Sequence, residues 1–275
     1  MRGVARSRLT ELAVELRASV ERSLAIYFRY PAQVVSDFLA TPLWMLFFTL
    51  PILMFAPPES WSSPEFLAKL YWGWITLGIL SSSFWSIGHA IEREAKMGTL
   101  EALFATNANR VVLFSGRVAV MVMSTLVEAA YVWALLHATF GFNPPVRDSA
   151  ALLTAWILVI ITAVGLSAAY GALVLRLKNP GALTNILQFA LVVLTGAFFP
   201  VTSLPGPLPS LAMLIPLTYP VDLVRWASIG EETLLDPALE FALSAALAAL
   251  SVALGGAALR AVEEENRRSG RLGFH

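Results

Sequence analysis

The 275-residue sequence contains no cysteine, three histidines and three lysines. Without cysteine, disulfide bonds, thiol catalysis and cysteine metal sites are excluded. His89, His137 and His275 are far apart in the sequence, so no spacing typical of a metal site is present. None of the lysines follows a glycine, and no glycine-rich loop ending in Gly-Lys-Ser or Gly-Lys-Thr occurs. We therefore expect no catalytic residue, no metal site and no ATP hydrolysis by this chain.

Charge is also scarce. Charged residues make up 14% of the sequence, hydrophobic residues make up 57%, and the mean hydropathy is +0.69. This composition is too apolar for an ordinary soluble domain. The net charge is zero, and no basic patch interleaved with aromatic residues is present, so nucleic-acid binding is not expected. The composition predicts an all-α polytopic membrane protein.

Six segments are apolar and long enough to cross a bilayer, which takes about 20 residues of helix. They are residues 34–56, 68–90, 117–140, 150–175, 182–201 and 238–260. We therefore predict an N-terminal amphipathic segment over 1–33, a six-span domain over 34–262 and a cytoplasmic tail over 263–275.

The distribution of basic residues predicts the orientation of these spans. Sixteen of the 19 lysines and arginines fall in residues 1–30, in 91–117, at Arg176 and Lys178, or in the tail from Arg260. Cytoplasmic loops collect basic residues, so both termini and the loop after the second span are assigned to the cytoplasm. Arginine outnumbers lysine 16 to 3 and alanine is abundant, which favours a prokaryotic plasma (inner) membrane. The first 33 residues carry too many charges for a cleaved signal peptide, so we expect them to be retained.

The N-terminal segment has a helical pattern that Pro31 ends. Apolar residues recur on one face of residues 9–28, while Arg8, Glu11, Glu15 and Arg22 occupy another. Such a helix can lie in the membrane interface with its apolar side in lipid. It can also pack as a short cytoplasmic helix on its own protein.

A charged hairpin follows the second predicted span, over residues 91–104. Glu92, Glu94 and Glu101 surround a Gly98-Thr99 step, and Thr99 could cap a short second helix with Glu101 in its first turn. A polar hairpin between two spans must sit at a membrane face, where it can contact a soluble partner. From composition alone, an ordinary solvated loop with ordinary charges is the better interpretation.

A charge-free run of 43 residues separates Lys178 from Asp222, and its second half is rich in proline. One span does not need this length, so we predict that residues 202–222 re-enter the membrane. Together with Phe198 and Phe199, this segment would form a packed cap over the exit of a path. Irregular backbone at that depth needs cover from protein or water. The alternative is an ordinary outer loop. Asp222 and Arg225 are three residues apart and are interpreted as a local ion pair.

Glu128 is the one acidic residue deep in a predicted span, ten positions after Val118. Carboxylates in a membrane are costly unless paired or protonated, and they usually face a cavity or the bundle interior. Glu128 is therefore a candidate contact for a cationic or hydrogen-bonding substrate. The structural alternative is a neutral acid bonded to a hydroxyl on a neighbouring helix.

Two further patterns have mainly structural interpretations. Trp72, Trp74 and Trp85 could line a path, although aromatic residues near span ends usually act as interface anchors. Small residues recur every four positions in the last predicted span and predict close helix packing. They are Ala245, Ala249, Ala253 and Ala257.

Two blocks of sequence resemble the permeases of ABC-2 type transporters, the membrane half of ATP-driven exporters. The first is Glu92-Arg93-Glu94 with Gly98-Thr99-Leu100-Glu101-Ala102-Leu103, which resembles the coupling-helix signature of that family. The second resembles the family's fifth-span exit and re-entrant segment. It comprises Gly196-Ala197-Phe198-Phe199-Pro200, Leu204-Pro205, Leu208, Ile215-Pro216-Leu217-Thr218-Tyr219 and Val221-Asp222-Leu223-Val224-Arg225.

The resemblance implies a six-span permease that dimerises with a second copy or a paralogue in the lipid bilayer. Each half would sit on a separate ABC ATP-binding subunit that carries ATP and Mg. The loop after the second span would insert into that subunit, and members of the family move drugs, antibiotics, lipids and lipid-linked glycans. The coupling residues implied are Glu92, Arg93, Glu94, Gly98, Thr99 and Glu101.

Three function classes follow from the sequence. The first is the permease subunit of an ATP-driven exporter for amphipathic cargo. The second is a transporter driven by an ion gradient, with Glu128 as a proton site. The third is a non-transporting membrane anchor for an ATPase.

Overall fold

The computed structural model describes residues 8–32, 61–96, 110–174 and 181–269, with scattered positions between 35 and 54. Every regular element in these ranges is helical, and no strand occurs among them, which confirms the prediction of an all-α fold for this part of the chain. The helices are α1 (Arg8–Arg29), α3 (Pro64–Lys96), α5 (Arg110–Phe140), α6 (Ser149–Val174), α7 (Gly181–Leu194), the 3-10 turn η2 (Val201–Ser203), α8 (Leu208–Ala212), α9 (Thr218–Ile229) and α10 (Pro237–Ser269).

Three segments are long and apolar enough to cross a membrane. They are Val120–Phe140 in α5, Ser149–Val174 in α6 and Pro237–Val262 in α10. α3 has the length for a span, but tryptophan, glycine and serine reduce its hydropathy. The predicted span 34–56 lies largely outside the described residues. The chain is thus a multi-pass membrane protein, and the count of six spans stays a prediction.

α7 is shorter than the span predicted over residues 182–201. It has 14 residues and ends at Leu194, where the chain turns through Gly196 at a φ of 72°. This left-handed conformation is open to glycine at little cost and does not continue an α-helix. The segment that follows contains η2 and α8 and leads into α9.

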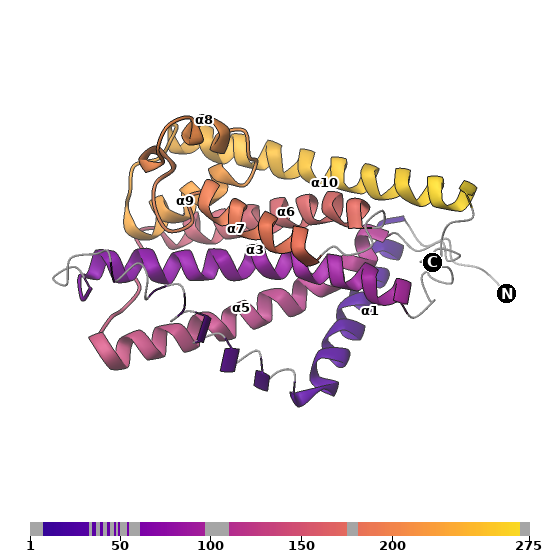
Figure 1. Ribbon diagram of the computed structural model, residues 1–275, viewed down its shortest axis with the longest axis horizontal. Helices are drawn as coiled ribbons and strands as arrows, with labels where there is room; N and C mark the ends of the chain where they lie inside the picture. The colour runs from indigo at the N-terminus through magenta and orange to yellow at the C-terminus, as the bar shows by residue number, and fades with distance from the viewer. Residues whose placement is uncertain are drawn as a thin grey trace.

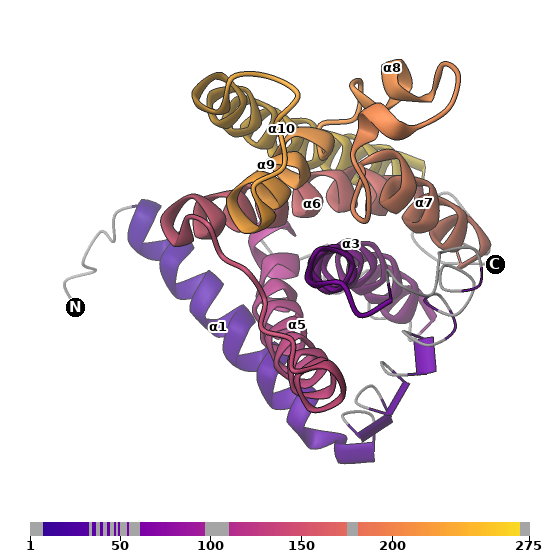
Figure 2. The same ribbon diagram turned by 90° about the vertical axis from the view of Figure 1, so that its left-hand side faces the viewer.

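The long helices α3, α5, α6 and α10 run roughly along the longest axis of the molecule (Figure 1). α6 packs against α3, α9 and α10, while α3 also contacts α5, α7 and α9 (Figure 2). The main core lies where these helices meet, and Leu80, Val159, Leu217 and Leu223 are fully buried in it.

α6 and α10 are in direct backbone contact. A Cβ added to Gly165 would stand 2.5 Å from the Ser251 carbonyl carbon, and one added to Gly255 would overlap the Gly165 carbonyl oxygen. The prediction that the alanines at 245, 249, 253 and 257 make the close contact within the chain is wrong, because all four are exposed. The buried side of α10 instead carries Glu240, Ser244, Ala248, Ser251 and Gly255.

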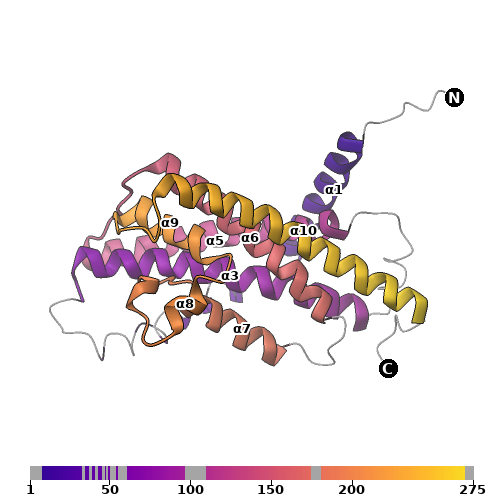
Figure 3. The same ribbon diagram turned by 90° about the horizontal axis from the view of Figure 1, so that it is seen from above.

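α1 runs across the direction of the long helices and packs against α5 (Figures 1 and 3). Val20, Leu24 and Tyr27 on its predicted apolar side are partly buried, whereas Ile26 and Phe28 remain 40% and 61% exposed. The helix therefore packs on its own protein along part of its surface, and apolar side chains are exposed on the rest.

Candidate functional site

Of the six residues predicted to couple to an ATP-binding subunit, the three that the structure describes lie at one end of the bundle. Glu92, Arg93 and Glu94 belong to the final turns of α3, whereas Gly98, Thr99 and Glu101 lie outside the described residues. The same end holds the end of α10 and the start of α5 (Figure 1). With 33 residues, α3 is about 50 Å long at 1.5 Å per residue, against about 30 Å for the hydrocarbon core of a bilayer. A spanning α3 must therefore project beyond the membrane.

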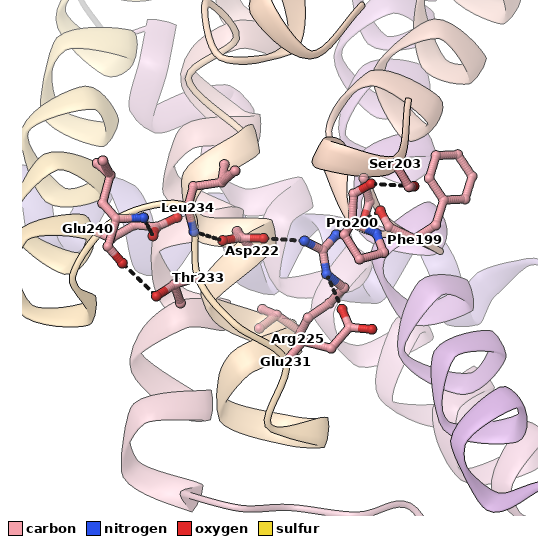
Figure 4. Close-up of polar contacts among 12 residues, drawn as sticks. Phe199, Pro200, Ser203, Asp222, Arg225, Glu231, Thr233, Leu234 and Glu240 are labelled. Atoms are coloured by element: carbon pink, nitrogen blue, oxygen red, sulfur yellow. Dashed lines mark hydrogen bonds and ion pairs between the residues drawn. The ribbon is translucent and has the colours of Figure 1, made fainter. Parts of the chain in front are cut away.

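α9 lies at the opposite end of the bundle (Figure 1), and a buried polar network is centred on its Arg225 (Figure 4). The Arg225 guanidinium donates to the Gly196 carbonyl and, at 3.0 Å, to the Phe199 carbonyl. It also pairs with Asp222 one turn earlier on α9. The local ion pair predicted from sequence is thus confirmed, and it additionally ties α9 to the turn that follows α7.

Gly196 is required by this arrangement for two reasons. Its φ is positive, and an added Cβ would stand 2.7 Å from Arg225 Nη1 and 2.8 Å from the Phe199 carbonyl oxygen. Only a residue without a side chain lets the guanidinium come this close to the backbone. Arg225 itself is 3% exposed, so these carbonyl oxygens take the place of water around its charge.

Three carboxylates from other parts of the chain complete the network. Glu231 lies 3.0 Å from Arg225 Nε and 3.0 Å from the Lys69 ammonium on α3. Lys69 also pairs with Glu65 at 2.8 Å. Glu240, in the first turn of α10, accepts a hydrogen bond from the Leu235 amide at 3.1 Å. The network therefore connects α3, α9 and α10.

Asp222, the ion-pair partner of Arg225, is almost completely shielded from solvent. It is 2% exposed and accepts a hydrogen bond from the Leu234 amide at 2.8 Å. Burial raises the pKa of the Asp222 carboxyl above its ordinary value, because the charged form loses hydration, while the Arg225 charge and the Leu234 amide oppose that rise.

Phe198 and Phe199 both lie beside the start of the segment that follows α7, and both are partly buried. The Phe198 ring packs on Gly73 of α3 and meets Trp74 edge to face, with 6.3 Å between ring centroids. Phe199 contributes its carbonyl oxygen to Arg225. These contacts place both residues at the junction of α3, α7 and α9, and a role in a substrate path stays a prediction.

Glu128 lies on α5, where its side chain faces α3. A Cβ added to Gly78 would stand 3.4 Å from Glu128 Oε2, and Thr125 lies against the same glycine. Glu128 is partly buried. This position between two long helices fits both a substrate contact and a structural acid, so both interpretations remain.

The tryptophans of α3 lie inside the bundle. Trp72 and Trp74 are 7% and 9% exposed and belong to the core, and Trp85 donates from Nε1 to the Gln188 amide oxygen at 2.7 Å. Their packing favours neither lipid-facing anchors nor an open path.

Sequence reasoning missed the parts played by Lys69, Glu231 and Glu240. Glu240 follows Asp236-Pro237, a pattern that reads as an ordinary helix start with an acid in the first turn. A weak signal was available: Glu240, Ser244, Ala248, Ser251 and Gly255 recur at helical spacing as small or polar residues in an apolar segment.

Comparison with known families identifies the class of protein that this bundle represents. The sequence model of the ABC-2 type transporter family matches residues 14–228, which run from α1 to the end of α9. The chain therefore belongs to the ABC-2 type transporter family. It is a transmembrane permease, the component of an ABC transporter that normally pairs with an ATP-binding subunit. No curated protein matches the chain at a significant level.

Proposed function

We propose that this permease exports amphipathic cargo, such as a drug, a lipid or a lipid-linked glycan, at the expense of ATP hydrolysed on a separate subunit. The permease would act as a dimer with a second copy or a paralogue in a prokaryotic plasma membrane. Both termini and the hairpin 91–104 would face the cytoplasm, where the partner subunit binds ATP and Mg.

The main support for this proposal is that α3 is one continuous helix from one end of the bundle to the other. One helix joins the candidate coupling residues Glu92, Arg93 and Glu94 to Lys69 at the far end of the bundle. Lys69 is ion-paired to Glu231, which also contacts Arg225 on α9. A movement imposed on the end of α3 by an ATP-binding subunit can therefore reach the segment around Phe198 and Phe199 without crossing a flexible joint.

The side chains along this connection support a coupling role. Phe198 packs on Gly73, one turn along α3 from Lys69, so displacement of α3 moves the support of the Phe198 ring. Because Arg225 binds the Gly196 and Phe199 carbonyls, α9 and this turn would move together. In this mechanism the chain's own residues transmit movement and shape a path, and no bond is broken on them.

Charge reversal at the coupling end tests the docking part of the proposal. Glu94→Lys and Glu101→Lys should each lower the amount of ATP-binding subunit that co-purifies with the permease by about tenfold, as expected for one lost interfacial charge pair. The matched control is Glu232→Lys, an exposed acid at the opposite end of the bundle. Unchanged co-purification in both coupling variants would contradict the docking role.

Transport itself is tested in proteoliposomes that contain the permease and its ATP-binding subunit. A fluorescent amphipathic dye should accumulate in the lumen only with hydrolysable ATP and should ignore ionophores. Dye movement by the permease alone, driven by a pH gradient, would favour the transporter that uses Glu128. ATP turnover that responds to no lipid or drug would favour the membrane anchor.

A further inference from the structure

The polar network at the α9 end holds more buried acids than bases. Asp222, Glu231 and Glu240 are its carboxylates, and Arg225 and Lys69 are its cations. Asp222 and Glu240 are 2% and 0% exposed. Glu65, which also pairs with Lys69, is largely exposed and adds a further negative charge at the edge. With all groups ionised, the buried part would carry one uncompensated negative charge.

The ion pairs show where this excess falls. Arg225 contacts Asp222 and Glu231, and Lys69 contacts Glu231 and Glu65. Among the residues that the structure describes, no ion pair reaches Glu240. Its Oε2 accepts from the Leu235 amide, and its Oε1 receives no hydrogen bond from any described donor. Within the described part of the chain, Glu240 is therefore a fully buried carboxyl group without an ion-pair partner.

Other charged groups on the elements around Glu240 have different partners. Arg147, before α6, lies over the Trp226 ring, and Asp148 caps α6 through the Ala150 and Ala151 amides. Asp236 caps α10, and Glu232 is exposed on the preceding loop. None of these contacts supplies a counter-charge to Glu240.

The side chain that faces Glu240 is the Asp222 carboxyl: the Leu234 amide donates to Asp222 and the next amide, that of Leu235, donates to Glu240, which brings the two carboxyl groups together. Two carboxylates cannot share a hydrogen bond, whereas a carboxylic acid donates readily to a carboxylate. An isolated ionised carboxylate in a dry interior is very costly, and such a group neutralises instead. A proton on Glu240 Oε1 lets that atom donate a hydrogen bond to Asp222, and it also removes the excess negative charge.

We propose that Asp222 and Glu240 form a proton-binding site in which one shared proton ties α9 to the first turn of α10. The proton is held on the Glu240 side, because Arg225 stabilises the negative charge on Asp222. When it leaves, two buried carboxylates face a single guanidinium that Glu231 already contacts. Their repulsion separates α9 from α10 and loosens the segment that Arg225 holds at Gly196.

The pH dependence has a definite sign. Loss of the shared proton leaves two buried carboxylates facing each other, so deprotonation weakens the tie between α9 and α10. Stability is therefore present at mildly acidic pH and falls as the pH rises. This inference does not depend on ATP, cargo or orientation in the membrane, because it concerns the isolated chain.

Infrared spectroscopy of the purified full-length permease in detergent tests the site directly. The wild-type spectrum at neutral pH should contain a carboxylic-acid C=O band that shifts in deuterated water and is absent in Glu240→Gln. The glutamine amide can donate to Asp222 and accept from Leu235 as the protonated acid does, so this variant should fold. Glu232→Gln, which removes an exposed acid nearby, should retain the band.

The thermal unfolding midpoint supplies the second readout. It should fall with rising pH in the wild type and in Glu232→Gln, and this fall should disappear in Glu240→Gln. In a Glu128→Gln background, which removes the other candidate neutral acid, a band that survives in Glu240→Gln, or the same pH slope with and without Glu240, would overturn the proposal. If Glu240→Gln does not fold, the Glu128→Gln variant is measured instead, because it removes the other intramembrane acid. The infrared band must then persist and must titrate together with the unfolding midpoint. Absence of the band would refute the shared proton.

Discussion

The Phe198 ring lies directly on Gly73, so that a Cβ added to Gly73 would overlap Cδ1 of the ring. This contact joins the turn after α7 to the first half of α3 and leaves no room for a side chain. It also gives the first of four predictions.

Replacement of Gly73 by alanine should destabilise the permease, because the Phe198 ring must leave its position between α3 and Trp74. Overpacking of this kind costs about 1–3 kcal/mol. The unfolding midpoint in detergent should fall, and Phe198→Ala in the same chain should restore part of the loss. Gly78→Ala is the matched control on α3, since its added Cβ would make only an ordinary 3.4 Å contact. Equal losses at both glycines would contradict this account.

Gly255 and the exposed alanines of α10 should respond differently to larger residues. Gly255→Leu would push the α10 backbone away from Gly165, whereas Ala253→Leu adds a side chain on the exposed side. We expect Gly255→Leu to lower the yield of folded protein severalfold in size-exclusion chromatography. Ala253→Leu should leave the yield of the monomeric chain unchanged. A severe folding loss in Ala253→Leu alone would place the contact on the other side of the helix.

Loss of Arg225 should be among the most damaging single changes in the network. Arg225→Met leaves Asp222 buried without its cation, and breaking a buried ion pair costs about 3–5 kcal/mol. Asp222→Asn in the same chain removes the stranded charge and should recover part of that stability in the same unfolding measurement. Lys69→Met, at the partly exposed edge, should cost less. No recovery in the double variant would show that the carbonyl contacts, rather than Asp222, dominate.

Glu128→Gln should leave folding and assembly intact, because the amide keeps the shape that fits against Gly78. If Glu128 contacts a cationic cargo, the variant should transport that cargo severalfold more slowly and neutral cargo normally. The measurement is ATP-dependent uptake of a matched pair of cationic and neutral dyes. Unchanged transport of every cargo would leave Glu128 with a structural role only.

The sequence predicted the parts of the fold that depend on local composition. Long apolar runs marked α6 and α10, and the spacing of Asp222 and Arg225 on one helix predicted their pair. The early end of α7 was missed, because an apolar run continues through Gly196 and hydropathy does not register a left-handed turn.

Contacts between distant parts of the chain could not be predicted from local composition and spacing. Lys69 and Glu231 are 162 positions apart, and nothing in their local sequence indicates that they meet. The small residues of α10 were recognised as packing residues, but alanine, glycine and serine occur on several sides of this helix. Periodicity alone could not decide which side meets α6.

The contact between Gly165 and Gly255 also limits how the permease can change shape. Helices that touch through side chains can slide by exchanging rotamers, but two backbones in contact have no such freedom. α6 and α10 should therefore behave as one rigid body. Opening and closing during a transport cycle would then be confined to the boundaries between this pair and the other helices, α9 included.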